Sequence, residues 1–305
     1  MMFSKLNCHT SISLSLLILI SGNLNGATGL PALHAYHSVS SLSLSGAGYL
    51  HSSVLSKNIN PAVYDDRQFS ASIIKYPSQI TSQSVGIALP MLNNLFCFSL
   101  NNISYGVFNG YDDSGVATDK YYSRDTHFKF SFSKKHPSLP IKIGLSSNYF
   151  FSQYQNYKIK VLNLSCGVIY NISKYQTKLG ISFQNWGINF SNLNVSLSNE
   201  TVLSSSTKLK HLPLRLYFDF VLDRHLEPSS LFTGGVFQIN KKLKLFFGSG
   251  SRKLDQNTKQ NIYKSIVGSS SVGFSYLLNT TSIRYGVYNY GTGAIVQGVE
   301  IGIEI

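Results

Sequence analysis

The feature that most constrains this chain is an alternation of apolar and polar residues with a period of two, which recurs along most of its length. In residues 128–133 phenylalanine alternates with lysine or serine, and residues 212–222 carry leucine or phenylalanine at every second position. Successive side chains of a β-strand point to opposite faces, so the pattern predicts strands whose two faces meet different surroundings. It occurs in about thirteen segments: 67–76, 82–91, 94–104, 127–134, 140–153, 157–170, 174–187, 211–223, 230–239, 242–250, 262–279, 281–290 and 295–305.

The length of these segments favours a membrane-spanning barrel over a soluble β-sandwich, which alternation alone leaves open. Several segments reach about ten residues, enough for a tilted strand to cross a bilayer, whereas strands of soluble proteins average about five or six. Aromatic residues gather near segment ends, as at 149–151 and 285–290, where interfacial girdles lie in such barrels. The sequence therefore predicts an all-β fold, a transmembrane antiparallel β-barrel. Single-chain bacterial barrels have even strand numbers, so we expect about 14 strands, with the missing one in 105–126 or in 262–279.

Three regions are expected along the chain. Residues 1–27 are organised like a secretory signal peptide, with Lys5, an apolar run from Ile12 to Ile20 and small residues up to Ala27. Residues 28–66 are rich in serine, glycine and alanine and follow no strong period. We expect them to form an N-terminal hatch, because irregular backbone at membrane depth must be enclosed by protein or by lumen water. Residues 67–305 form the barrel, which we expect in the outer membrane.

Composition bears on the partners. Charged residues make up only 13% of the chain, about half of the usual share, so charge does not cover its outer surface. The formal net charge is +13, but the basic residues are scattered singly and form no run, which argues against nucleic acid as a partner. Outer-membrane lipid is the expected neighbour of the barrel wall.

The chain ends on a strand of the same alternating kind. Its apolar positions are Val299, Ile301, Ile303 and Ile305. We expect this strand to be recognised by the barrel assembly machinery during biogenesis.

Residues that could carry chemistry form no convincing site. His34 and His37 are the only closely spaced histidines, and no cysteine or carboxylate lies near them in the sequence, so we expect no metal site and no cofactor. Cys97 and Cys166 are expected to be ordinary strand residues, although an oxidising compartment would permit a disulfide between them. The segment Asp112–Gly115 is better explained as a tight turn than as a calcium loop. We therefore expect no enzymatic activity.

Short motifs in the N-terminal region resemble a known family. Gly46-Ala47-Gly48 is followed, after a stretch of small and polar residues, by Asn60-Pro61-Ala62. This order resembles the "G-G-A … N-P-A" opening of the PorV/PorQ family, which is related to FadL-type fatty-acid transport barrels. Val63 stands where a glycine is common in the wider group. Proline stiffens the backbone and asparagine caps turns, so Asn60-Pro61-Ala62 is expected to make the turn that leads from the hatch into the first strand.

The resemblance continues along the rest of the chain. Tyr105-Gly106 and the stretch Gly110–Gly115 are similar to the family's acidic-glycine hairpin, and Asn185-Trp186-Gly187 and Leu212-Pro213-Leu214 stand where the family has "N-x-G" and "L-P-F". The hairpin and the last motif are closer to PorQ than to PorV. The resemblance implies a fourteen-stranded barrel that takes part in type IX secretion or in surface attachment of cargo, with secretion-system proteins and secreted cargo as partners.

Three functions therefore stand open. The first, from the resemblance, is a component or scaffold of type IX secretion. The second is a FadL-like channel for hydrophobic solutes, which requires an apolar lumen and a lateral opening in the wall. The third is an outer-membrane lipase, which requires a serine, a histidine and an acid together on one outer face.

Overall fold

The computed structural model describes residues 35–91, 94–112, 114–154, 157–191, 197, 199–222, 228–251, 269–289 and 294–304. The signal peptide predicted for residues 1–27 lies outside this part of the chain, as do the first residues of the predicted hatch, 28–34, which include His34, and the final Ile305.

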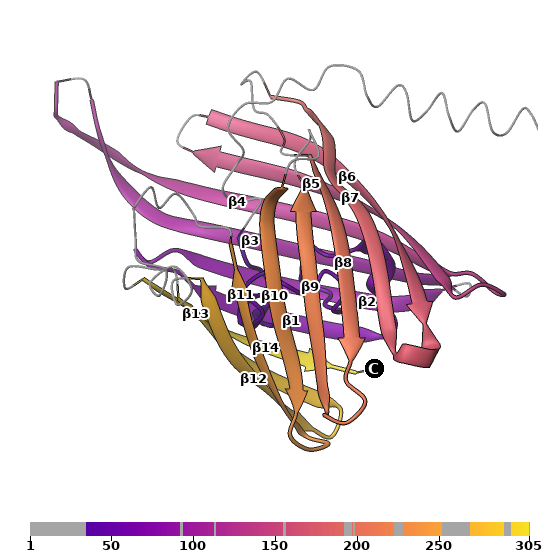
Figure 1. Ribbon diagram of the computed structural model, residues 1–305. Helices are drawn as coiled ribbons and strands as arrows, with labels where there is room; N and C mark the ends of the chain where they lie inside the picture. The colour runs from indigo at the N-terminus through magenta and orange to yellow at the C-terminus, as the bar shows by residue number, and fades with distance from the viewer. Residues whose placement is uncertain are drawn as a thin grey trace, which may run out of the picture.

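In the described part of the chain, fourteen strands form one closed barrel (Figure 1). Each strand pairs antiparallel with its neighbours in sequence, and β1 pairs with β14 to close the sheet. The predicted all-β barrel is thereby confirmed. The strands are β1 Gln68–Lys75, β2 Thr81–Met91, β3 Asn94–Tyr111, β4 Ala117–Lys135, β5 Ile141–Tyr154, β6 Tyr157–Ile172, β7 Thr177–Asn189, β8 Glu200–Lys208, β9 Leu214–Leu222, β10 Pro228–Gln238, β11 Leu243–Gly250, β12 Ser270–Leu278, β13 Thr281–Asn289 and β14 Ile295–Ile303.

The strand missing from the sequence-based count is β8, and both places predicted for it were wrong. The stretch 105–126 holds no separate strand, because β3 runs on to Tyr111 and β4 begins at Ala117. In the segment 262–279, β12 begins only at Ser270, and residues 262–268 lie outside the described chain. The sequence of β8, ETVLSSSTK, has serine and threonine on both faces, so its period of two has little contrast in hydropathy.

The two faces of the sheet have opposite character. In β14 every second residue is buried, and the alternate positions Val299, Ile301 and Ile303 point outward with exposed fractions of 47%, 46% and 36%. In β9, Phe218 is 49% exposed on the outside, whereas its neighbour Tyr217 is 3% exposed and points into the lumen. A closed barrel with an apolar exterior is suited to the hydrocarbon of a bilayer. Among the described residues, no helix is long and apolar enough to cross a membrane.

The outward face of β9 gives a direct test of this orientation. Leu216 belongs to the outward set of β9, so Leu216→Arg places a guanidinium in hydrocarbon and should cost about 2–4 kcal/mol of folding free energy near the bilayer midplane. The matched control is Leu216→Met, which keeps the site apolar. Folding into lipid vesicles at increasing urea concentration measures both variants, and equal stabilities would show that the faces have been assigned wrongly.

One hairpin projects from the barrel, and the two cysteines of the wall face opposite sides. Figure 1 shows the hairpin of β3 and β4, the longest strands with 18 and 19 residues, extending well beyond the neighbouring strands. In the turn that joins them, Gly115 has φ +79° and the Asp112 carboxylate accepts hydrogen bonds from the Ser114 and Val116 amides at 3.0 and 2.8 Å, as in a tight turn. Cys97 is buried on the lumen side and Cys166 is exposed on the outer side, and both are free thiols.

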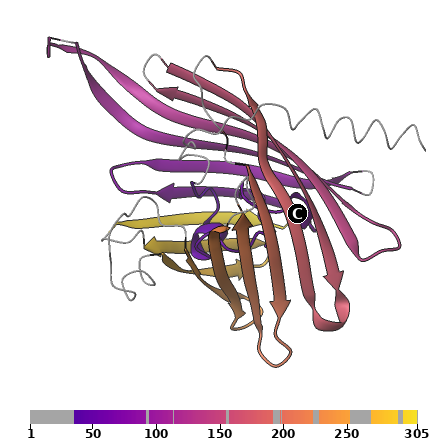
Figure 2. The same cartoon turned by 45° about the horizontal axis from the view of Figure 1, so that its top comes forward.

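The chain before β1 lies inside the barrel. Figure 2 shows this segment, in indigo, surrounded by the strands. It contains the short helix α2, Val39–Ser43, and the 3₁₀ turn η2, Pro61–Val63; a further 3₁₀ turn, η3, Ser173–Tyr175, joins β6 to β7. Residues 35–66 are called the plug below.

Candidate functional site

The plug fills the lumen through apolar contacts with two different parts of the wall. Its first half, through Leu44, Ala47 and Tyr49, packs with residues of β8 to β11. Its second half, through residues such as Val54 and Ile59, packs with residues of β2, β3 and β6. The plug therefore bridges the lumen from one side of the wall to the other.

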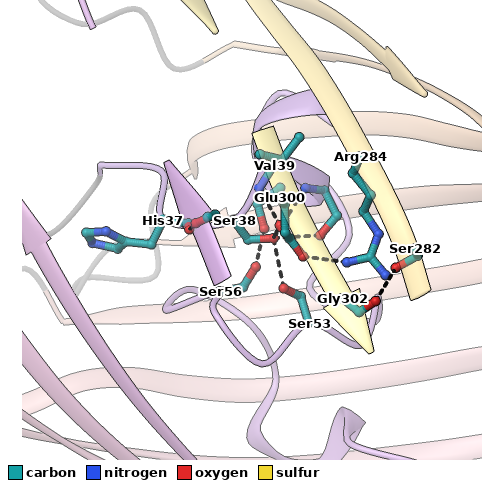
Figure 3. A network of polar contacts seen from close by, with 12 residues as sticks. His37, Ser38, Val39, Ser53, Ser56, Ser282, Arg284, Glu300 and Gly302 are labelled. Carbon is teal, nitrogen blue, oxygen red and sulfur yellow. Dashed lines mark hydrogen bonds and ion pairs between the residues drawn. The ribbon is translucent and has the colours of Figure 1, made fainter. Parts of the chain in front are cut away.

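The first half of the plug is held by a buried carboxylate on β14 (Figure 3). The Glu300 side chain is fully buried, and its Oε2 accepts hydrogen bonds from the Val39 amide at 2.7 Å and from the Ser38 hydroxyl at 3.0 Å. Its Oε1 forms an ion pair with Arg284 of β13. Ser38 is also the N-cap of α2, and Ser53 donates to its hydroxyl at 2.8 Å. A negative charge beside the exposed amides of a helix start is favourable, so Glu300 fixes both the position and the direction of α2.

A second buried carboxylate holds the turn after α2. Asp219 of β9 accepts hydrogen bonds from the Gly48 amide at 2.6 Å and from the Tyr49 amide at 3.4 Å. Gly46 and Gly48 have φ values of +86° and +89°, in the left-handed region that side chains disfavour. The two glycines of the sequence motif are thus the positions where the plug turns sharply, inside the lumen and next to β9.

Lysine side chains from the opposite wall hold the second half of the plug. Lys129 of β4 donates to the Ser56 carbonyl at 2.6 Å, and Lys142 of β5 donates to the Tyr64 carbonyl at 2.6 Å and to Asp65 at 2.5 Å. These ammonium groups bond backbone carbonyls that would otherwise be unpaired inside the barrel.

The structure places Asn60-Pro61-Ala62 against the lumen faces of β5, β6 and β7. Asn60 is the N-cap of η2: its Oδ1 accepts from the Ala62 amide at 3.0 Å, and its Nδ2 donates to the carbonyls of Val168 and Ile181 at 3.1 and 3.0 Å. Gly144 and Gly167, which pair across β5 and β6, face this turn. A methyl group at either glycine would overlap the backbone of Pro61 or the amide of Asn60. This close approach explains the glycines on the wall.

An apolar cluster lies in the half of the lumen toward Tyr154 and Tyr157, where β5 meets β6, which is called the outer half below. Ile103 of β3, Phe150 of β5 and Val161 of β6 pack there with Leu197, which belongs to the connection between β7 and β8. The pairing of β7 with β8 ends at Gln184 and Glu200, while β7 continues alongside β6 to Asn189. Leu197 of this connection therefore lies inside the lumen, beside the point where the β7–β8 pairing ends.

The motif Asn185-Trp186-Gly187 lies at this same point. Asn185 has φ +60°, and the register of β6 and β7 shifts between Leu164 and Cys166, so that β7 carries an extra residue opposite them. Bulges of this kind bend a strand and end regular pairing.

Of the described histidines, His37 and His51 lie in the plug and His127 lies in the lumen wall, whereas His136 and His211 lie in exposed turns between strands. The His37 and His127 rings are 5.1 Å apart, and Nδ1 of His37 is hydrogen-bonded to the Ser82 hydroxyl at 3.0 Å. Burial, followed by the charges of Lys57 and Lys129, lowers the pKa of His37 to about 3, so its imidazole is neutral. Within the described residues no group of three or more His, Cys, Asp or Glu side chains could hold a metal ion.

A small cavity remains between the first half of the plug and the wall. Its volume is about 50 Å³, and its lining includes His37, Tyr49, Lys57, Phe232 and Tyr288. A space of this size suits one or two water molecules and not a solute.

Lys57, which reaches this cavity, gives a pH-dependent prediction. Desolvation lowers the pKa of Lys57 from 10.5 to about 7; Glu200 opposes this shift, Lys129 adds to it, and Asp125 opposes it. Between these two values the unfolded chain binds more protons than the folded protein, so stability rises with pH in that window. The midpoint of thermal unfolding should therefore rise from about pH 6 to about pH 9. In Lys57→Met this rise with pH should be smaller. Identical pH slopes in the two proteins would contradict this account of Lys57.

The sequence analysis did not predict the charged residues of the wall that bind the plug. Glu300, Asp219, Lys129 and Lys142 are single charges on the polar face of their strands, where a solvated lumen lining was the simpler interpretation. The one available signal was their position on the face opposite to the apolar residues, which indicates the lumen but names no partner.

Comparison with known proteins identifies the architecture and no family. No protein-family model matches the sequence, and no curated protein does. A solved structure of the "TodX deltaS2S3 mutant monoaromatic hydrocarbon channel" is similar, with a TM-score of 0.51 and 10% identity over 81% of this chain and 93% of that one. A Pseudomonas aeruginosa FadL homologue gives a TM-score of 0.49 at 10% identity over 87% and 98% of the two chains. The Acinetobacter baumannii outer membrane protein Omp33 gives 0.46 at 6% identity over 79% and 98%. The first likeness supports the barrel fold.

Proposed function

We propose that this protein is a non-enzymatic outer-membrane channel for small apolar solutes, which enter the outer half of the lumen and leave sideways through the wall between β7 and β8. The observation that carries the proposal is the apolar cluster of Ile103, Phe150, Val161 and Leu197 beside the end of the β7–β8 pairing. The fold likeness to a protein described as a monoaromatic hydrocarbon channel supports the same class of solute.

The plug disfavours a route in which the solute crosses the whole lumen along the barrel axis. Its backbone is tied to both sides of the wall by Glu300, Asp219, Lys129 and Lys142, so a solute crossing the whole lumen must break these bonds. An apolar solute that leaves through the wall enters the bilayer directly and does not require the plug to move. The plug then serves as a hatch that keeps the barrel closed to water.

Uptake of toluene tests the channel. Leu197→Glu places a carboxylate in the apolar cluster and should lower toluene uptake by roughly tenfold or more, because an apolar solute cannot solvate a buried charge. Leu197→Met is the matched control and should retain uptake. The measurement compares cells with equal amounts of each protein in their outer membranes. Equal uptake by both variants and by cells without the protein would refute the channel.

A scaffold in type IX secretion is the second candidate function. It is favoured by the resemblance of Asn60-Pro61-Ala62 and its neighbours to the PorV/PorQ family. The projecting β3–β4 hairpin adds a surface that a partner could bind, because Tyr111 and Tyr122 are 65% and 66% exposed on it. Purification of the tagged protein from its own outer membrane should recover secretion-system proteins or cargo if this function holds. Recovery of the barrel alone, together with toluene uptake, would favour the channel.

The described histidines do not support a lipase. The lipase alternative required a histidine beside a serine and an acid on one outer face. Among the described histidines, His37, His51 and His127 contact plug and wall residues in the lumen, and His136, in the turn after β4, accepts hydrogen bonds from the Ser138 and Leu139 amides. His211 lies in the turn between β8 and β9.

A further inference from the structure

The wall formed by β3 to β6 carries a group of buried amide and imidazole side chains without partners. Asn101 pairs in register with His127, and Asn148 pairs with Asn163, so the four side chains lie in two neighbouring rows on the lumen face. Their exposed fractions are 0%, 0%, 6% and 1%. Within the described chain, no side-chain nitrogen or oxygen of these four residues has a hydrogen-bond partner.

Unpaired polar atoms in a folded interior carry their full desolvation cost, because water has been removed and nothing replaces it. An amide presents both a donor and an acceptor. A molecule that supplies both kinds of group would therefore offset the cost at this wall, whereas a hydrocarbon would not.

The neighbouring charges are already engaged, which limits the chemistry of such a molecule. Lys129, in the same row as Asn148, donates to two plug carbonyls at 2.6 and 3.3 Å. Asp125 accepts from the Tyr105 hydroxyl at 2.6 Å. The groups left for a ligand are thus uncharged, and they favour an uncharged hydrogen-bonding group.

Apolar side chains adjoin these polar ones. Phe150 and Val161 continue the row of Asn101 and His127 along β5 and β6, and the His127 and Phe150 rings are 4.7 Å apart. Leu197 packs on Phe150 and Val161 and is the member of that cluster that comes from a connection between strands.

We infer that this wall binds a small molecule with an apolar body and an uncharged hydroxyl or amide group. The body takes the place of Leu197 against Phe150 and Val161, and the polar group bonds Asn148, Asn163 and their neighbours. The inference rests on the proposed function, since it names the class of solute that enters the outer lumen.

Three probes of similar size distinguish the alternatives: benzyl alcohol, toluene and benzoate. Binding is measured by calorimetry on the full chain in lipid nanodiscs, with empty nanodiscs as the blank. Benzyl alcohol should bind at least about tenfold more tightly than toluene or benzoate, as expected where buried polar groups select a hydroxyl. The variant Asn148→Leu/Asn163→Leu should lose this preference for benzyl alcohol over toluene.

The variant is expected to fold, because replacing unpaired buried amides with apolar groups of similar size is neutral or stabilising. Ser70→Ala is the matched control: Ser70 is also buried with an unpartnered hydroxyl, but it lies on β1, away from this wall. It should keep the preference for benzyl alcohol.

Several results would overturn the inference. Equal binding of benzyl alcohol and toluene, tightest binding of benzoate, or a preference that survives in the double variant would each do so. These outcomes are separate from failure of the channel. Toluene uptake by cells with no preference in binding refutes this site alone, whereas selective binding of benzyl alcohol without uptake of any probe refutes the channel alone.

Discussion

Replacing Glu300 with alanine should destabilise the folded protein by about 3–5 kcal/mol, because the change leaves a buried charge without its partner. Arg284 is 17% exposed at its side chain and pairs with Glu300, whose own side chain is fully buried. The same substitution removes the acceptor for the Val39 amide and the Ser38 hydroxyl, so α2 loses its attachment to β14. Urea unfolding followed by fluorescence of the single tryptophan, Trp186, measures the loss.

Two further variants separate the causes. Glu300→Gln keeps one acceptor oxygen but removes the charge, so it should be more stable than Glu300→Ala. In Glu300→Ala/Arg284→Met the unpaired cation is gone, and part of the lost stability should return. Wild-type stability in Glu300→Ala, with no new proteolysis between residues 38 and 56, would show that Glu300 does not hold the plug.

Deleting residues 36–62 should convert the barrel from a closed state to a conducting pore in planar bilayers. Small barrels of about eight strands fill their interior with side chains, whereas those of about sixteen strands enclose an aqueous channel. A barrel of fourteen strands stands near the second case, so its closure depends on the plug. In the intact protein these residues should resist protease, because they are enclosed by the wall.

A single substitution provides a milder version of the same experiment. In Gly167→Leu the new side chain would overlap the Asn60 amide and should loosen the contact of Asn60-Pro61-Ala62 with the wall. The expected result is intermittent conductance in place of a permanently open pore. Val168→Leu, one residue further on the outward face of β6, is the control and should stay closed. Unchanged conductance after the full deletion would mean that the plug does not close the lumen.

The fold was predictable from the sequence wherever the two sheet faces differ in hydropathy. β9 and β14 alternate apolar and polar residues, and the structure confirms them as strands with the expected outward side chains. β8 was missed because serine and threonine occur on both of its faces. The part of β3 after residue 104 and the part of β4 before residue 127 were not predicted as strand. Glycines at 106 and 110 make this stretch resemble a loop.

The interior of the lumen was much harder to foresee. The polar face of β9 indicated the lumen but no contact with another part of the chain. In the structure Tyr217 of this face is 3% exposed, and its hydroxyl is hydrogen-bonded to His51 of the plug at 3.1 Å. Pairings such as Gly48 with Asp219 and Val39 with Glu300 join residues 171 and 261 positions apart. No local pattern in one sequence indicates such contacts.

The motif residues occupy positions with plain structural causes. Gly46 and Gly48 have positive φ, and Asn60 caps the turn that Pro61 begins. The last strand has its apolar side chains on the outer face, at Val299, Ile301 and Ile303. Recognition of this strand by the barrel assembly machinery stays a prediction.

The native cysteine of β3 measures most directly whether the plug fills the barrel. Cys97 is fully buried on the lumen side, with its thiol 3.8 Å from the Val54 carbonyl of the plug, whereas Cys166 faces outward and can be replaced by serine. In the Cys166→Ser background, a membrane-impermeant maleimide should leave Cys97 unmodified in the folded protein and should modify it once residues 36–62 are deleted. Modification of Cys97 in the intact chain, or protection of Cys97 after the deletion, would contradict a lumen closed by this segment.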